Sequence, residues 1–115
     1  MKLKLNQYPQ VIAEIELKIL NASCQLEIQT EQIGFMDGEI EVEIASNSSL
    51  TNEQHRKAKR LELRQQPDYL ESLAKLKAIK EQREKLTIKL NQLRNEFSVA
   101  KLETRMTIAQ LEAAA

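Results

Sequence analysis

The residues whose types and spacing most clearly suggest a binding site form a basic cluster near the middle of the chain. Its arginines recur every four residues, a spacing that would place them on one face of a helix. Such a face could follow successive phosphates of a nucleic acid. The residues of this candidate site are Arg56, Lys57, Lys59, Arg60 and Arg64.

A second interpretation of the basic cluster needs no ligand. Glu39, Glu41 and Glu43 precede it, and they would partly neutralise a solvated helix face. Tyr69 is the only nearby aromatic residue that could stack on a base. We favour the solvated face and keep nucleic-acid binding as the alternative.

Other reactive side chains are too isolated to form a catalytic or metal centre. Cys24 is the only cysteine and His55 the only histidine, which excludes an intrachain disulfide and most metal and general-base constellations. We interpret Cys24 as a packing residue and His55 as a surface residue. Acidic residues two apart on a helix point in different directions and cannot converge on one substrate. The sequence therefore predicts no enzyme, no cofactor, no metal and no small-molecule substrate.

A stripe of apolar residues at steps of three and four predicts the first long helix. This heptad pattern keeps one side of a helix facing a partner helix, with Gln29 the polar exception. We place this helix at residues 9–45, with Pro9 in its first turn. The seam comprises Ile12, Ile15, Ile19, Ala22, Leu26, Ile33, Met36 and Ile40.

Residues 34–44 leave an alternative open. Gly34 and Gly38 followed by the alternation of Ile40, Val42 and Ile44 are also compatible with a turn and a short strand. Because the heptad steps continue through this stretch, we favour helix.

A polar turn and a short basic helix connect the two long helices. We expect the turn at residues 46–51 and the short helix at residues 52–65. Thr51 and Gln54 fit a capping box at its start. Pro67 then interrupts the chain and suits the first turn of the next helix.

The last helix is predicted at residues 67–112. Its seam begins at Tyr69 and passes through Leu73, Leu76 and Ile79, so two steps of three follow each other and imply a phase slip. Arg83 lies on the seam, where it could pair with a carboxylate or with Gln29. The apolar part of the seam comprises Leu76, Ile79, Leu86, Leu90, Leu93 and Phe97, and it continues through Thr104, Ile108 and Leu111.

Charge favours pairing the two long helices with each other. Up to Glu53 the chain has three basic and nine acidic residues, and the remainder has fourteen basic and eight acidic ones. Opposite charges favour pairing the first long helix with the last one over pairing two copies of the same helix. The expected fold class is therefore all-α: an antiparallel helical hairpin of two coiled-coil helices joined by a short basic helix, in one elongated unit of residues 1–115.

The first helix has a second apolar face, which predicts association between chains. A helix that is apolar on two sides is usually covered on both. We expect the chain to form a homo-oligomeric bundle through this face, although a different coiled-coil protein is an alternative partner. The residues of the oligomer seam are Leu17, Cys24, Ile28, Phe35 and Val42.

Targeting signals are lacking at the sequence level. Residues 1–5 alternate charge without an apolar core, which is unlike a signal peptide. No apolar run approaches the ~18 residues of a membrane span. We expect a cytoplasmic protein without a membrane partner.

Three stretches resemble short bacterial and phage coiled-coil proteins of uncharacterised function. They are residues 52–58 after the polar turn, residues 67–69, and residues 93–97, within a resemblance that covers about residues 50–105. The resemblance implies two long helices joined through a short basic one, with no catalytic residues. Similar proteins occur beside phage recombination and single-strand DNA functions, which adds weight to the nucleic-acid alternative.

The function expected from the sequence is a non-enzymatic, self-associating coiled-coil module for structure or protein interaction. The alternative is an accessory nucleic-acid-binding protein that uses the short basic helix, and the resemblance implies a relation to phage recombination.

Overall fold

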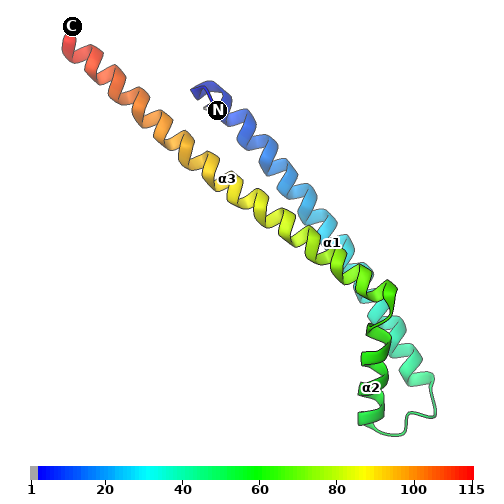
Figure 1. Ribbon diagram of the computed structural model, residues 1–115. Helices are drawn as coiled ribbons and strands as arrows, with labels where there is room; N and C mark the ends of the chain where they lie inside the picture. Colours follow the sequence, from blue (N-terminus) through cyan, green and yellow to red (C-terminus); the bar gives the residue numbers. More distant parts are fainter. Residues whose placement is uncertain (1–2) are drawn as a thin grey trace. The chain divides into compact units, whose positions relative to one another are not determined.

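The computed structural model describes residues 3–115, and all regular structure in that range is helical. A short 3-10 helix, η1 (Leu5–Gln7), precedes three α-helices: α1 (Tyr8–Ser46), α2 (Glu53–Arg64) and α3 (Pro67–Ala114) (Figure 1). The all-α expectation is confirmed. Residues 1 and 2 of the expected 1–115 unit lie outside the described residues.

Helix α1 is continuous from Tyr8 to Ser46, where residues 9–45 were expected. Before it, the backbone N–H of Gln7 donates to the backbone oxygen of Lys4 (2.9 Å), which closes the 3-10 turn, and the backbone N–H of Lys4 donates to Gln7 Oε1 (2.8 Å), which caps it. The helix passes through Gly34 and Gly38, so residues 34–44 do not form a turn and a strand. The heptad pattern outweighs the local weakness that two interior glycines introduce.

Helix α2 follows a short turn and begins with a different cap from the expected one. The side chain of Asn52 accepts the backbone N–H of His55 at 2.8 Å, so Asn52 is the N-cap. The predicted capping box of Thr51 and Gln54 is therefore wrong by one position. Asn is among the residues most preferred at the N-cap, and the negative charge of Glu53 in the first turn interacts favourably with the helix dipole.

Helix α3 begins at Pro67 and continues to Ala114, a little beyond the expected residue 112. Proline suits this position because it lacks the amide that has no helical partner there. Asp68 adds an acidic residue to the first turn.

The chain divides into two compact units, and the first consists of Met1–Asn21 with Gln82–Ala115. Its core joins the beginning of α1 to the second half of α3 (Figure 1). Tyr8 is 1% exposed, and its ring stacks on that of Phe97 with centroids 5.3 Å apart. The buried residues of this core are Tyr8, Ile12, Ile15, Leu90 and Leu93.

The second unit, Ala22–Glu81, contains the rest of α1, all of α2 and the start of α3. The buried residues of its core cluster are Ile33, Ile40, Ile44 and Tyr69. Met36, Leu50, Leu63 and Leu76 pack against them, so α1, α2, α3 and the turn all contribute to this core.

The buried positions of α3 keep an unbroken three–four pattern, which corrects the expected phase slip. Ser72 is half-buried between Tyr69 and Leu76, whereas Leu73 is exposed. The prediction followed the larger apolar residue, but the steps from Tyr69 to Ser72 and Leu76 continue the heptad without a defect. Residues 101–115 are all exposed, which includes the expected seam positions Thr104, Ile108 and Leu111.

Candidate functional site

The basic cluster lies on α2, and its arginines contact carboxylates of the second unit. Arg60 donates from Nε to Glu41 Oε1 (2.6 Å) and from Nη2 to Glu41 Oε2 (3.1 Å). This two-point contact fixes the guanidinium on the carboxylate and links α2 to α1. Arg60 also lies 4.0 Å from Glu53.

One helical turn further along α2, Arg64 joins a second polar contact. Arg64 Nε and Tyr69 Oη both donate to Asp37 Oδ1, at 3.2 Å and 2.9 Å. A single carboxylate of α1 therefore holds α2 and the first turns of α3. At the start of α2, Arg56 pairs with Glu53 at 3.2 Å.

The electrostatics of these contacts match their geometry. The hydrogen bond from Arg60, with its positive charge, lowers the pKa of the Glu41 carboxyl below its usual range. The same contact raises the pKa of Arg60. Burial, then the hydrogen bond to Asp37 and its negative charge, raise the pKa of Tyr69. Each shift favours the protonation state that keeps the helices together.

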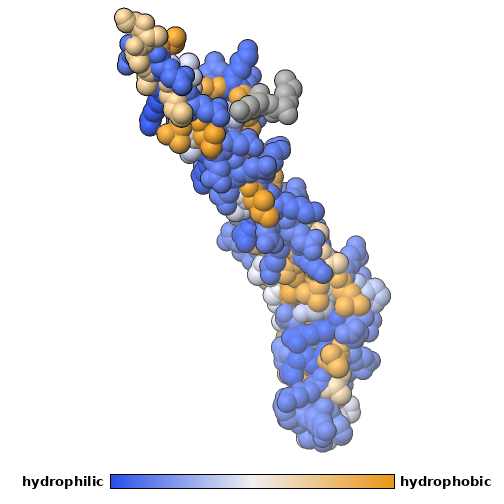
Figure 2. Space-filling view, turned by 60° about the vertical axis from the view of Figure 1, so that its left-hand side comes forward, coloured by the Kyte–Doolittle hydropathy of each residue, from blue (hydrophilic) through white to orange (hydrophobic). Residues whose placement is uncertain are grey.

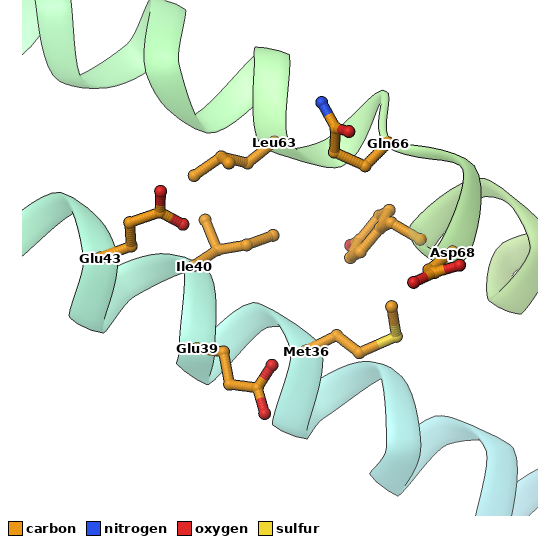
Figure 3. Close-up of a pocket in the computed structure, with 8 residues that line it drawn as sticks. Met36, Glu39, Ile40, Glu43, Leu63, Gln66 and Asp68 are labelled. Atoms are coloured by element: carbon orange, nitrogen blue, oxygen red, sulfur yellow. The ribbon is translucent and has the colours of Figure 1, made fainter.

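A small groove lies between α1 and α2 beside these contacts (Figure 3). Met36, Ile40, Leu63 and Tyr69 supply its apolar lining. Carboxylates of α1 and α3 lie around it, and its volume of about 130 Å³ is well below that of an ordinary small-molecule pocket. The charged residues of the groove are Glu39, Glu43 and Asp68, with Gln66 beside them.

The two remaining basic residues of the cluster differ in their contacts. Lys59 lies 3.6 Å from Glu62 on α2. Lys57 is exposed and forms no ion pair among residues 3–115. His55 is exposed, and its backbone N–H donates to the N-cap side chain of Asn52.

A buried polar contact joins α1 to α3 within the second unit. Gln29 is 6% exposed, and its Nε2 donates to the backbone oxygen of Ser72 at 2.9 Å. The expected pairing of Arg83 with Gln29 is therefore wrong, because Ser72 takes this place. Arg83 is half-buried and forms no ion pair within residues 3–115.

The residues expected to form the intrachain seam divide into buried and half-buried positions. Those buried are Ile12, Ile15, Ala22, Ile33, Ile40, Ile79, Leu90 and Leu93. Those half-buried are Ile19, Leu26, Met36, Leu76, Leu86 and Phe97.

The opposite side of α1 is uncovered. Figure 2 shows apolar residues in patches among the hydrophilic surface, and Phe35 is 71% exposed. A Cβ added at Gly34 or Gly38 would meet no atom within 4 Å, so this side has open space around it. We call the part of this side that lies in the second unit the outer face of α1. Its residues are Cys24, Ile28, Glu31, Phe35, Gly38, Glu39 and Val42. Leu17, the remaining residue of the expected oligomer seam, is also exposed.

Sequence reasoning missed several residues that make these contacts. Tyr8 lies four residues before Ile12 and Ile44 four after Ile40, so the helical spacing of apolar residues could have found them. Asp37 lacks such a signal, because its role depends on where α2 and α3 return to α1.

Within residues 3–115, no group of three or more His, Cys, Asp and Glu side chains could hold a metal ion. In the same residues, no helix combines the length and apolar character of a membrane span. Comparison with protein-family models, with curated proteins and with solved structures gave no match.

Proposed function

We propose that this chain is a non-enzymatic helical interaction module. In this proposal α1 and α3 form an antiparallel hairpin joined through α2, and hairpins associate into a helical bundle through the outer face of α1. The proposal places the protein in the cytoplasm, where an exposed single thiol such as Cys24 stays reduced.

Contacts between α1 and α3 in each unit support the antiparallel hairpin. In the first unit, Tyr8 stacks on Phe97 and Glu16 pairs with Arg94 at 3.3 Å. In the second unit, Gln29 contacts Ser72. As the residue number rises along α1, the number of its partner in α3 falls, which is the order of an antiparallel pair.

The exposure of large apolar residues on α1 is the observation that carries self-association. Ile28, Phe35 and Val42 recur every seven residues, and each is at least 66% exposed. Single exposed apolar residues are normal, but a heptad row along one helix is typical of a surface that another helix covers.

Sedimentation velocity over a range of protein concentrations tests this function. We expect the wild-type chain to associate and Phe35→Glu to shift the population to monomer, because a carboxylate would be buried in the contact. Leu61→Glu is the matched control, since Leu61 is 62% exposed on α2 and outside the outer face. A wild-type chain that stays monomeric at every concentration would overturn the proposal.

The nucleic-acid alternative has less support. Binding of phosphates would compete with the carboxylates that hold Arg56, Arg60 and Arg64. Lys57 is the residue of the cluster that is free to bind. Fluorescence anisotropy with a labelled single-stranded oligonucleotide at low salt tests this alternative, and binding that Lys57→Glu and rising salt both weaken would favour it.

A further inference from the structure

In the first unit, helix α3 continues past the start of α1 (Figure 1). Tyr8, the first residue of α1, stacks on Phe97 of α3. Beyond this point, residues 101–115 are all exposed. We call residues 101–115 the tail of α3, and at ~1.5 Å per residue it is about 22 Å long. Within residues 3–115, no helix covers it.

The tail continues the side of α3 that α1 covers further down the helix. Phe97 and Ala100 pack against the core of the first unit. Thr104, Ile108 and Leu111 follow Ala100 at steps of four, four and three, so they lie on the same side of the helix. Ile108 is 50% exposed and Leu111 is 67% exposed. The tail therefore extends an established helix contact beyond the end of its partner.

Charged residues lie along the edges of this side. Arg105 and Glu112 are seven residues apart, and each directly follows a residue of the apolar side, so both lie along one edge. Neither has an opposite charge three or four positions away, and neither forms an ion pair within residues 3–115. Lys101 lies on the same edge, with its Nζ 4.4 Å from the centroid of the Phe97 ring. Glu103 lies at the other edge.

A second copy of the tail that runs antiparallel matches this arrangement. Ile108 is the midpoint of residues 101–115, so two fully overlapping antiparallel tails meet at Ile108 of both copies. Arg105 then lies opposite Leu111 and beside Glu112 of the other tail, and symmetry repeats this contact. A parallel pair would instead place Arg105 beside Arg105 and Glu112 beside Glu112, and like charges across a contact are destabilising.

A groove in the first unit lies where the end of the second tail would reach. It has a volume of about 370 Å³. Leu3 and Leu5 line it from the residues before α1, and Thr104 and Ile108 line it from the tail. In the antiparallel pair, residues 113–115 of the second tail approach this groove. These residues are three alanines, whose small side chains let one helix come close to another.

We propose that the tail of α3 is a contact between copies, in which two tails pair antiparallel around Ile108. Each copy contributes the same surface, so the contact is isologous. Because the tails are short, they bury less surface than a stable interface does, and we expect weak pairing. The tail is separate from the outer face of α1, so this inference goes beyond the proposed function and does not depend on it.

Sedimentation equilibrium at high protein concentration tests the surface. The parent chain carries Phe35→Glu, which removes association through the outer face of α1. We expect it to form a weak dimer that Ile108→Glu abolishes, because the two carboxylates would meet at the centre of the contact. Met106→Glu is the matched control, since Met106 is 62% exposed and lies two positions from Ile108, on the opposite side of the tail.

Two outcomes of this experiment overturn the inference. One is a Phe35→Glu chain that stays monomeric at every concentration. The other is a dimer that Met106→Glu weakens as much as Ile108→Glu does. Circular dichroism verifies that each variant keeps its helices.

Disulfide formation tests the direction of the pair. With Cys24→Ser as the background, Thr104→Cys and Leu111→Cys are prepared as separate chains. Antiparallel tails bring position 104 of one copy to position 111 of the other, so only the equimolar mixture should form an intermolecular disulfide on mild oxidation. Disulfides within each separate preparation, with none gained on mixing, would indicate parallel tails and overturn the proposal.

Exchange of charge tests the register. Arg105→Glu and Glu112→Arg should each weaken the tail dimer about fivefold, because like charges then meet twice across the contact. The chain that carries both changes should regain the original dimer. Single variants that pair like the parent chain, or a double variant as weak as either, would overturn the register. If the tails pair but Phe35→Glu leaves association of the wild type unchanged, the proposed function fails while this inference stands.

Discussion

The two units of the molecule hold their helices together by different means. The first unit relies on apolar packing around Tyr8 and the stacked ring of Phe97, with an exposed ion pair beside it. The second unit adds polar contacts between helices, centred on Asp37, Glu41 and Gln29. Helices α1 and α3 contribute to both units. The different kinds of contact therefore come from the residues that each segment of these helices carries.

This contrast indicates what each kind of contact contributes. Apolar packing supplies most of the free energy of folding but accepts many arrangements of similar volume. Directed polar contacts contribute less free energy, and they favour one register because their atoms must meet. The second unit has three helices to position, and it carries more of the polar contacts that join different helices than the first unit, where Arg94 pairs with Glu16.

The largest effect is expected from removing the aromatic ring of the first unit. Tyr8→Ala should lower the free energy of unfolding by roughly 3–5 kcal/mol, because it leaves a cavity at the most buried side chain. Urea unfolding followed by circular dichroism measures it. Tyr8→Phe keeps the ring and should change little. A large loss with Tyr8→Phe would show that polar contacts matter in the first unit too.

A smaller effect is expected at the buried amide of the second unit. Gln29→Ala should cost about 2 kcal/mol, because it removes both packing volume and the donor to Ser72. Gln29→Leu fills the volume without the hydrogen bond and should cost less than about 1 kcal/mol. Urea unfolding of both variants separates the two contributions. Equal losses would mean that the hydrogen bond, and not the volume, dominates.

The sequence predicts the first unit better than the second, for a physical reason. The seam from Ile12 onward follows from periodicity alone, since a buried stripe must recur at three and four residues. Ser72 was missed because its contact uses a backbone oxygen, which residue type does not reveal. Asp37 was missed because its two partners lie 27 and 32 residues away, and only the path of the chain brings them together.

The tyrosine of the second unit should respond differently from Tyr8. Tyr69→Phe should cost about 1 kcal/mol at neutral pH, because the hydrogen bond to Asp37 is lost. Because the pKa of Tyr69 is raised in the folded chain, its contribution is fully present below the ordinary value of 10.0 and is lost as pH rises from there through the raised value. The gap between the urea midpoints of wild type and Tyr69→Phe should therefore be smaller at pH 10.5 than at pH 7. A gap that stays constant would contradict this role for the hydroxyl.

Gly38 of the outer face allows a test that separates folding from association. Gly38→Ala should raise the free energy of unfolding by about 0.5–1 kcal/mol, because the added Cβ meets no atom and the helix gains rigidity. If another helix covers this face closely, the same methyl group should weaken association. Thermal unfolding at low concentration and sedimentation at high concentration measure the two effects. Destabilisation at low concentration would mean that the face is already occupied within the chain.

The smallest effect is expected at the exposed ion pair of Arg60 and Glu41. The pKa of Glu41 is lowered in the folded chain, so its contribution is present above its ordinary value of 4.5 and is lost as pH falls through the lowered value. Arg60→Gln should therefore unfold at a slightly lower urea concentration than wild type at pH 7, and the difference between the two midpoints should be smaller at pH 3. A matched change in the first unit is Arg94→Gln, which breaks the pair with Glu16. If polar contacts hold only the second unit in place, Arg94→Gln should leave the urea midpoint unchanged at both pH values. A drop as large as that of Arg60→Gln would contradict the distinction between the two units.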